Sequence, residues 1–140
     1  MFTDLATALR AAAQDALPSG VYATSRVFHD AVDAELAASN TRAVNISFAI
    51  ATSEQITCGA NPRWRSTGIL YVRLYEPATK GDRTQLDAAS TISDALRGLR
   101  ITKNGVQISL YGPALENEPR EGSMWVRSVS VPFKADMVQS

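Results

Sequence analysis

Alternation of apolar and polar positions in the middle of the chain predicts two β-strands. Residues 44–51 place their larger apolar side chains on one side of an extended chain, which is typical of a strand with one buried face. Residues 67–75 are apolar on both faces and are expected at the centre of a sheet. The polar residues 52–66 between them predict a long connection rather than strand.

A spacing of three and four between apolar residues predicts two amphipathic helices. Residues 3–17 are rich in alanine and carry one narrow apolar stripe: Leu5, Leu9, Ala13 and Leu17. A second helix is expected to start at Thr84 as N-cap, with Asp87 three positions later, and to end before Gly98. Its predicted buried stripe is Leu86, Ala89, Ile92 or Ser93, and Leu96.

The remaining segments add two strands and several connections. Asn104-Gly105 is a tight-turn signal before an expected strand at 106–111. Residues 124–133 form the last expected strand, with Trp125, Val129, Val131 and Phe133 on one face. Residues 112–122 are interpreted as a polar loop and 134–140 as a tail. Residues 21–27 could form a strand, whereas the spacing from Phe28 to Asn40 favours a short helix.

This order of elements predicts an α+β fold. Sequential strands usually pair antiparallel, so we expect a mostly antiparallel sheet of four to five strands with two main helices packed on it. A length of 140 residues fits a single domain, 1–140, with an N-terminal helix in residues 1–20.

Net charge narrows the classes of partner. The 14 basic and 14 acidic residues cancel, which argues against a protein that binds nucleic acid through overall positive charge. Residues 1–40 nevertheless carry two basic against five acidic residues, and residues 41–80 carry five basic against two acidic. Such unlike segments suit contact between neighbouring subunits, although they can also be an ordinary solvated surface. No stretch is long and apolar enough to predict a signal peptide or a membrane span, so a soluble protein of a reducing cytosol is expected.

Candidate chemistry is sparse. The chain has one His and one Cys, so a nucleophilic thiol could use only His29 as base for Cys58. His29 and Asp33 could share a helix face, but a metal would need a further ligand. Glu116, Glu118 and Glu121 lie in the expected polar loop and are interpreted as solvated. We therefore expect no catalytic residues, metal or cofactor, and no enzymatic activity.

Arg63-Trp64-Arg65 is the most suggestive triplet. Two guanidinium groups beside an indole could clamp a carboxylate surface or stack on a base, and both residue types are enriched in protein interfaces. The alternative is that Trp64 packs inward at the start of a strand while the two arginines face water. Arg63, Trp64 and Arg65 are our candidate interface residues.

The second half of the sequence resembles a known family. The residues that carry the resemblance are the run 68–77, the helix 86–98, Gly105-Val106, Gly112-Pro113 and the closing strand from Trp125 to Phe133. Together they resemble the tail terminator proteins of long, non-contractile-tailed phages, the minor tail protein U-like group. The resemblance covers roughly residues 44–136.

The resemblance implies a structural role in a virion. Such proteins form a hexameric ring at the head-proximal end of the tail tube, stop its polymerisation and meet the head-completion protein. The implied partners are other copies of the chain, the tail tube protein and the head-completion protein. DNA can pass through such a ring, but no membrane or specific nucleic-acid partner is expected. Assembly in the bacterial cytoplasm is implied. A tail-tube subunit, another head–tail connector, or a small enzyme using His29 and Cys58 are the alternatives.

Overall fold

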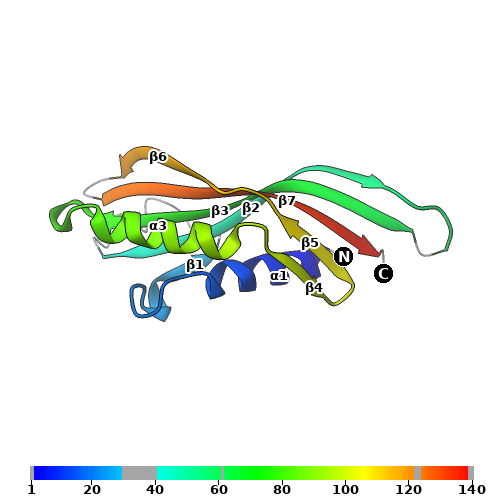
Figure 1. The fold of residues 1–140 in the computed structure, drawn as a ribbon, viewed down its shortest axis with the longest axis horizontal. Helices are drawn as coiled ribbons and strands as arrows, with labels where there is room; N and C mark the ends of the chain where they lie inside the picture. Colours follow the sequence, from blue (N-terminus) through cyan, green and yellow to red (C-terminus); the bar gives the residue numbers. More distant parts are fainter. Residues whose placement is uncertain (1, 30–40, 61, 122–123, 139–140) are drawn as a thin grey trace.

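The computed structural model describes residues 2–29, 41–60, 62–121 and 124–138, which form a sheet with helices on one side. Within these residues the sheet has seven strands in the order β1-β2-β3-β7-β5-β4, and β6 also pairs with β7. Figure 1 shows an elongated molecule in which α1 and α3 lie against the same side of the sheet. The predicted α+β class with two helices on a mostly antiparallel sheet is confirmed, but the sheet contains more strands than the four to five expected.

Three long antiparallel strands make the centre of the sheet. They are β2 (Ala43–Gln55), β3 (Arg63–Pro77) and β7 (Met124–Val138). The central strand β3 pairs with β2 on one side and, over its whole length, with β7 on the other. The central position expected for residues 67–75 is therefore confirmed.

The outer edge of β7 is shared by two shorter strands. β5 (Val106–Leu110) pairs with the second half of β7, and β6 (Ala114–Glu121) pairs with the first half. Between them the Tyr111 amide donates to the Pro132 carbonyl oxygen at 2.9 Å, so pairing to β7 continues across the bend. β5 and β6 thus act as one bent strand beside β7.

Short elements complete the edges. β4 (Arg100–Lys103) pairs with β5 through the turn at Asn104-Gly105, where both residues have positive φ as a type I′ hairpin requires. β1 (Val27–His29) runs parallel to β2. Two single 3-10 turns lie at Thr24–Arg26 and Ala78–Lys80. The predicted tight turn at Asn104-Gly105 is confirmed.

The helices α1 (Phe2–Asp15) and α3 (Arg83–Leu96) cover the apolar face of the sheet. The apolar stripe of α1 is buried as predicted, with Leu5, Leu9 and Ala13 inaccessible to water. Gly98 follows α3 with φ of 68°, which confirms its expected role after the helix end. The largest buried side chains of the core under the helices are Leu5, Leu9, Ile46, Leu70, Leu74, Ile92, Leu96, Ile108 and Phe133.

A buried glutamine fixes α3 to the sheet. Gln85 is fully buried, and its amide nitrogen donates to the carbonyl oxygens of Leu74 at 2.8 Å and Trp125 at 3.2 Å. Its amide oxygen accepts from the Arg127 guanidinium at 2.9 Å. The predicted stripe put Leu86 inside instead, but Leu86 is 37% exposed. The buried stripe is centred on Gln85, Ala88, Ala89, Ile92 and Leu96, which places Leu86 at its edge. The predicted N-cap at Thr84 is also wrong, because α3 starts at Arg83 with Asp82 as N-cap.

Three segments expected to be irregular are strands. Residues 52–55 and 63–66 extend β2 and β3, so the predicted connection shrinks to residues 56–62. Residues 114–121 form β6 instead of a loop, and residues 134–138 continue β7 instead of forming a tail. In the hairpin, hydroxyl pairs such as Ser53 and Ser66, 3.0 Å apart, take the place of apolar cross-strand contacts. Polar composition therefore concealed the strands.

The helix expected from Phe28 is wrong at its start. Phe28 and His29 belong to β1 and pair in parallel with Asn45 and Ile46 of β2. The rest of that predicted helix, 30–40, lies outside the described residues. Across the described part of the chain, no helix combines the length and apolar character needed to cross a membrane.

Candidate functional site

The strand geometry separates the side chains of Arg63-Trp64-Arg65. These residues begin β3, and successive side chains on a strand point to opposite faces. Arg65 lies opposite Asp136 on the open face, whereas Trp64 lies opposite the buried Met137 on the helix-covered face. The indole is therefore not flanked by the two guanidinium groups, and the proposed clamp of all three side chains does not form.

Arg65 forms an ion pair within the chain. Its Nε and Nη2 donate to the two carboxylate oxygens of Asp136 at 2.8 and 3.1 Å, a bidentate arrangement. These hydrogen bonds lower the pKa of Asp136, and the charges of Lys134 and Arg63 act in the same direction. The same pairing raises the pKa of Arg65. Asp136 is consequently ionised at neutral pH, and both of its carboxylate oxygens already accept hydrogen bonds from Arg65 of the same chain.

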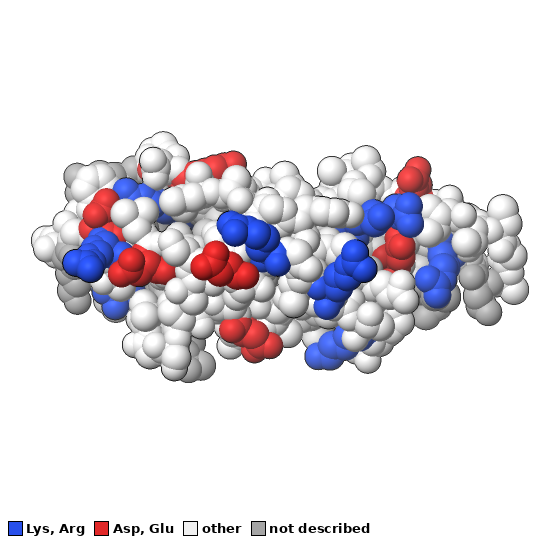
Figure 2. Space-filling model, in the orientation of Figure 1, with Lys and Arg blue, Asp and Glu red and all other residues white. Residues whose placement is uncertain are grey.

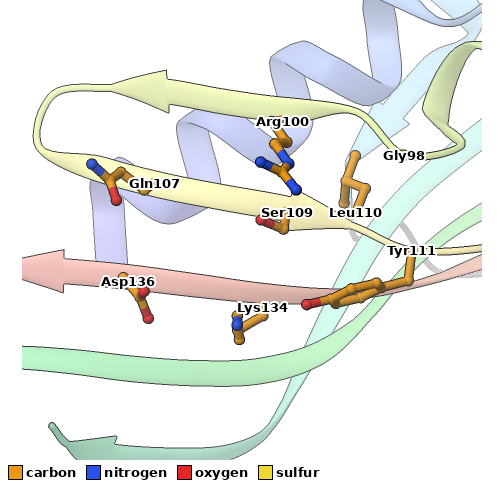
Figure 3. A pocket seen from close by; sticks show the side chains of 8 residues that line it. All are labelled: Gly98, Arg100, Gln107, Ser109, Leu110, Tyr111, Lys134 and Asp136. Carbon is orange, nitrogen blue, oxygen red and sulfur yellow. The ribbon is translucent and has the colours of Figure 1, made fainter.

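A polar hollow of about 400 Å³ opens next to this pair on the open face. Lys134 of β7, Ser109 of β5 and Arg100 of β4 lie in one direct cross-strand row through it. Figure 3 shows the Arg100 guanidinium directed toward Ser109 and the Tyr111 hydroxyl directed toward Lys134. The full lining is Gly98, Arg100, Gln107, Ser109, Leu110, Tyr111, Lys134 and Asp136.

Basic side chains gather around this hollow. Figure 2 shows them toward the end of the molecule where the β2–β3 hairpin projects, with fewer acidic groups among them. The charged residues on the open face there are Arg63, Arg65, Arg100 and Lys134 against Glu54 and Asp136. Since Asp136 is held by Arg65, the surface has a net positive charge suited to an anionic group of a partner.

The other candidate residues do not form a site together. His29 pairs with Ile46 on β2, while Cys58 is exposed in the loop beyond Gln55, about 30 Å further along the same strand at ~3.3 Å per residue. A thiol and an imidazole at that separation cannot share a proton. The alternative of an enzyme using His29 and Cys58 is therefore wrong in its geometry.

The predicted carboxylate cluster lies on β6. Glu118 forms an ion pair with Arg73 of β3, with a carboxylate oxygen 2.7 Å from the Arg73 Nε. Glu116 accepts a long hydrogen bond of 3.4 Å from the Ser130 hydroxyl, and Glu121 ends the strand. Within the described ranges no group of three or more His, Cys, Asp or Glu residues could hold a metal ion.

Sequence reasoning missed the row Lys134, Ser109 and Arg100. The three residues are separated by nine and twenty-five positions in the chain, and only strand pairing brings them together. One signal was present: residues 134–137 alternate between charged and apolar, and Ala135 and Met137 are buried. That period of two would have indicated a strand where a tail was expected.

Comparison with known proteins gives a likeness of fold only. No protein-family profile matches this sequence, and no curated protein matches it. A chain in the structure described as the virion of a native gene transfer agent particle has a TM-score of 0.50 and 17% identity. The match covers 96% of this chain and 97% of that chain.

A further solved structure, which carries no functional name, has a TM-score of 0.55 at 16% identity. It covers 99% of this chain and 92% of the other. Both matches extend over almost the whole of this chain and of the chain it is compared with, so the likeness concerns the complete arrangement of helices and strands. At these identities it establishes a common fold.

Proposed function

We propose that this chain is a structural virion protein that forms a ring at the head-proximal end of a phage-type tail tube. In this role it ends polymerisation of the tube and joins the tail to the head. The observation that carries the proposal is the likeness of fold, over 96% of the chain, to a chain of a gene transfer agent virion. The sequence resemblance to tail terminator proteins supports the same role independently.

The architecture suits repeated contact between identical copies. A cyclic ring needs two different surfaces on each copy, because every interface joins one surface to the other. This molecule offers a helix-covered face and, on the opposite side of the sheet near the hairpin, an exposed polar surface with Arg65 and Lys134. The β2–β3 hairpin also projects at one end and can reach a neighbouring copy or the tube.

Deletion of the gene for this chain from the genome that encodes the particle tests the proposal. Without a terminator, the tube subunits are expected to polymerise to irregular lengths and the tails to remain unattached to heads. Electron microscopy of the particles measures both outcomes, and a plasmid copy of the gene is expected to restore uniform, attached tails. Complete absence of tubes would instead identify a tube subunit. Attached tails of normal length would contradict a terminator role.

The size of the assembly is tested separately. Native mass spectrometry and negative-stain images of the purified protein, alone and with the tube subunit, are expected to show six-fold rings. A different ring size would correct the number of copies while leaving the role in place. A protein that binds neither itself nor the tube would contradict the proposal.

A further inference from the structure

Two like charges flank one hydroxyl group in the polar hollow. Lys134 and Arg100 lie on either side of Ser109 in adjacent strands, so their backbones are about 10 Å apart at ~4.8 Å per strand. The acidic group of the hollow, Asp136, is already bound by Arg65. An anion over Ser109 would contact both cations and accept from the hydroxyl, relieving their mutual repulsion.

We propose that this hollow receives a carboxylate from the helical layer of a second copy of the chain. The proposal rests on the proposed function, because it assigns one of the contacts between neighbouring copies in the ring. The ligand is an aspartate side chain of α1 or α3. The receiving groups are the Lys134 ammonium, the Arg100 guanidinium and the Ser109 hydroxyl.

Charge complementarity identifies the second copy as the occupant. The helices α1 and α3 carry Asp4, Asp15, Asp87 and Asp94 against only Arg10 and Arg83. Figure 3 looks onto the hollow with α1 behind the sheet, so the acidic layer and the basic hollow face opposite directions. They cannot meet within one molecule. Stacking the helical layer of one copy on the open face of the next brings them together, as a head-to-tail contact requires.

A carboxylate fits the hollow better than a nucleic-acid backbone. Duplex DNA is typically held by roughly six to ten phosphate contacts along an extended basic surface. Here the row offers two cations on a chain whose net charge is zero. Two cations on either side of one hydroxyl group instead match a single acidic side chain, which Arg can bind through two parallel hydrogen bonds.

Carbodiimide cross-linking tests the contact directly, because it joins a carboxylate to a lysine amine only when the two touch. The chain has three lysines, so Lys80 and Lys103 serve as internal references for Lys134. Full-length protein labelled with nitrogen-15 is mixed with unlabelled protein, and mixed-isotope peptides identify links between copies. We expect Lys134 to join an aspartate of α1 or α3 of another copy.

Variants separate this contact from general association. Arg100→Gln removes the second cation and is expected to reduce the mixed-isotope Lys134 link roughly tenfold, as loss of one partner in an interfacial charge pair does. Thr79→Ala, exposed in the 3-10 turn Ala78–Lys80 and outside both the hollow and the two helices, is the control and is expected to leave the link unchanged. Lys134→Arg keeps the charge, so rings are expected to persist while the link disappears.

Three results would overturn the proposal. One is a Lys134 link only to Asp136 of the same copy, and another is no mixed-isotope link through Lys134 at ~1 mM protein. The third is binding of a 20-base-pair duplex that Arg100→Gln abolishes, which would assign the hollow to phosphate. Six-fold rings that lack the Lys134 link would reject this contact and leave the proposed function standing.

Discussion

At the scale of single residues, Gly68 marks a place where the sheet leaves no room for a side chain. It lies in β3 opposite Ile50 and Phe133, next to an irregularity of pairing between Ile50 and Thr52. A Cβ atom at this position would collide with the carbonyl oxygen of Ala49 and lie 2.9 Å from the Phe133 ring. Glycine is therefore required here by space, since its φ is not in the left-handed region.

Gly68→Ala is expected to destabilise the fold by about 1–3 kcal/mol, the usual cost of overpacking. Gly112→Ala is the matched control, because a Cβ there would meet nothing within 4 Å, and it is expected to change stability by less than ~0.5 kcal/mol. Urea unfolding followed by circular dichroism measures both. Equal unfolding midpoints for the two variants would contradict the close approach at Gly68.

The Arg65–Asp136 pair predicts a dependence of stability on pH. The pKa of Asp136 is lowered in the folded protein, from ~3.9 in an unfolded chain, chiefly by its hydrogen bonds to Arg65. The folded state therefore gains stability from this group above about pH 4, and that gain disappears as the pH falls through the lowered pKa.

Asp136→Asn is accordingly expected to be less stable than the parent protein at pH 7, with the difference closing as the pH falls below about 4. Thermal unfolding between pH 7 and pH 2.5 measures the difference. The exposed Asp94, 3.8 Å from Arg97, provides the control, and Asp94→Asn is expected to differ from the parent by at most ~0.5 kcal/mol at pH 7. A pH-independent difference for Asp136→Asn would show that the ion pair does not stabilise the fold.

At the scale of elements, one polar side chain sets the position of α3. Gln85 bonds two carbonyl oxygens of neighbouring strands and receives a hydrogen bond from Arg127, which also donates to Asn117 of β6 at 2.8 Å. The helix is thus tied to β3, β7 and β6 through one amide. Removal of that amide leaves buried polar groups without partners, which costs more than the loss of a surface hydrogen bond.

Gln85→Met, which keeps the length of the side chain, is expected to lower the free energy of unfolding by about 2–3 kcal/mol. Ser90→Ala on the exposed side of the same helix is expected to have little effect, within ~0.5 kcal/mol. Chemical denaturation measures both changes. A neutral Gln85→Met variant would show that apolar packing alone positions α3.

Elements with an apolar period could be predicted from the sequence, and elements without one could not. The stripe of α1, the strand at residues 44–51 and the Asn104-Gly105 turn each have a local signal that the structure confirms. The single buried face expected for that strand is wrong, because Asn45 is buried and Ile50 is 37% exposed. The strand β6 has none, because it is an edge strand rich in charge, and Pro119 lies where its pairing with β7 is irregular. Its hydrogen bonds are made with β7, and a pattern within residues 114–121 does not reveal that partner.

The candidate site shows the same division. Arg65 was identified from its residue type and neighbours, but its partner Asp136 is seventy-one residues away. The residues Arg100, Ser109 and Lys134 acquire meaning only through the register of β4, β5 and β7. Single-sequence reasoning therefore finds a charged residue at a surface more readily than it finds the row of partners that the sheet assembles around it.

At the scale of the whole molecule, two opposite faces and one projecting hairpin define how copies can meet. The helical layer is acidic, the open face near the hairpin is basic, and the long strands β2, β3 and β7 hold both on one sheet. Because both faces belong to the same sheet, the angle between them is fixed. In a head-to-tail assembly that angle determines whether the contacts close into a ring.

The tip of the β2–β3 hairpin is expected to serve assembly rather than folding. Residues 57–62 contribute exposed hydrogen bonds, from Gln55 to the Thr57 carbonyl oxygen and from the Arg63 amide to the Thr57 hydroxyl, both 2.7 Å. Replacing residues 57–62 by Asn-Gly preserves the pairing of Ile56 with Arg63 and closes the hairpin with a favoured turn.

The free energy of unfolding of that variant, measured by thermal unfolding, is expected to change by about 1 kcal/mol or less, because shortening a surface loop alters the loop-closure entropy only slightly. Ring formation and binding to the tube subunit, measured by native mass spectrometry and negative-stain images, are expected to be lost. Cys58→Ser changes one exposed atom of the same loop and is the control, with assembly expected to be retained. Normal rings from the shortened hairpin would show that the two faces of the sheet suffice for assembly, whereas an unfolded variant would show that the tip is needed for the sheet itself.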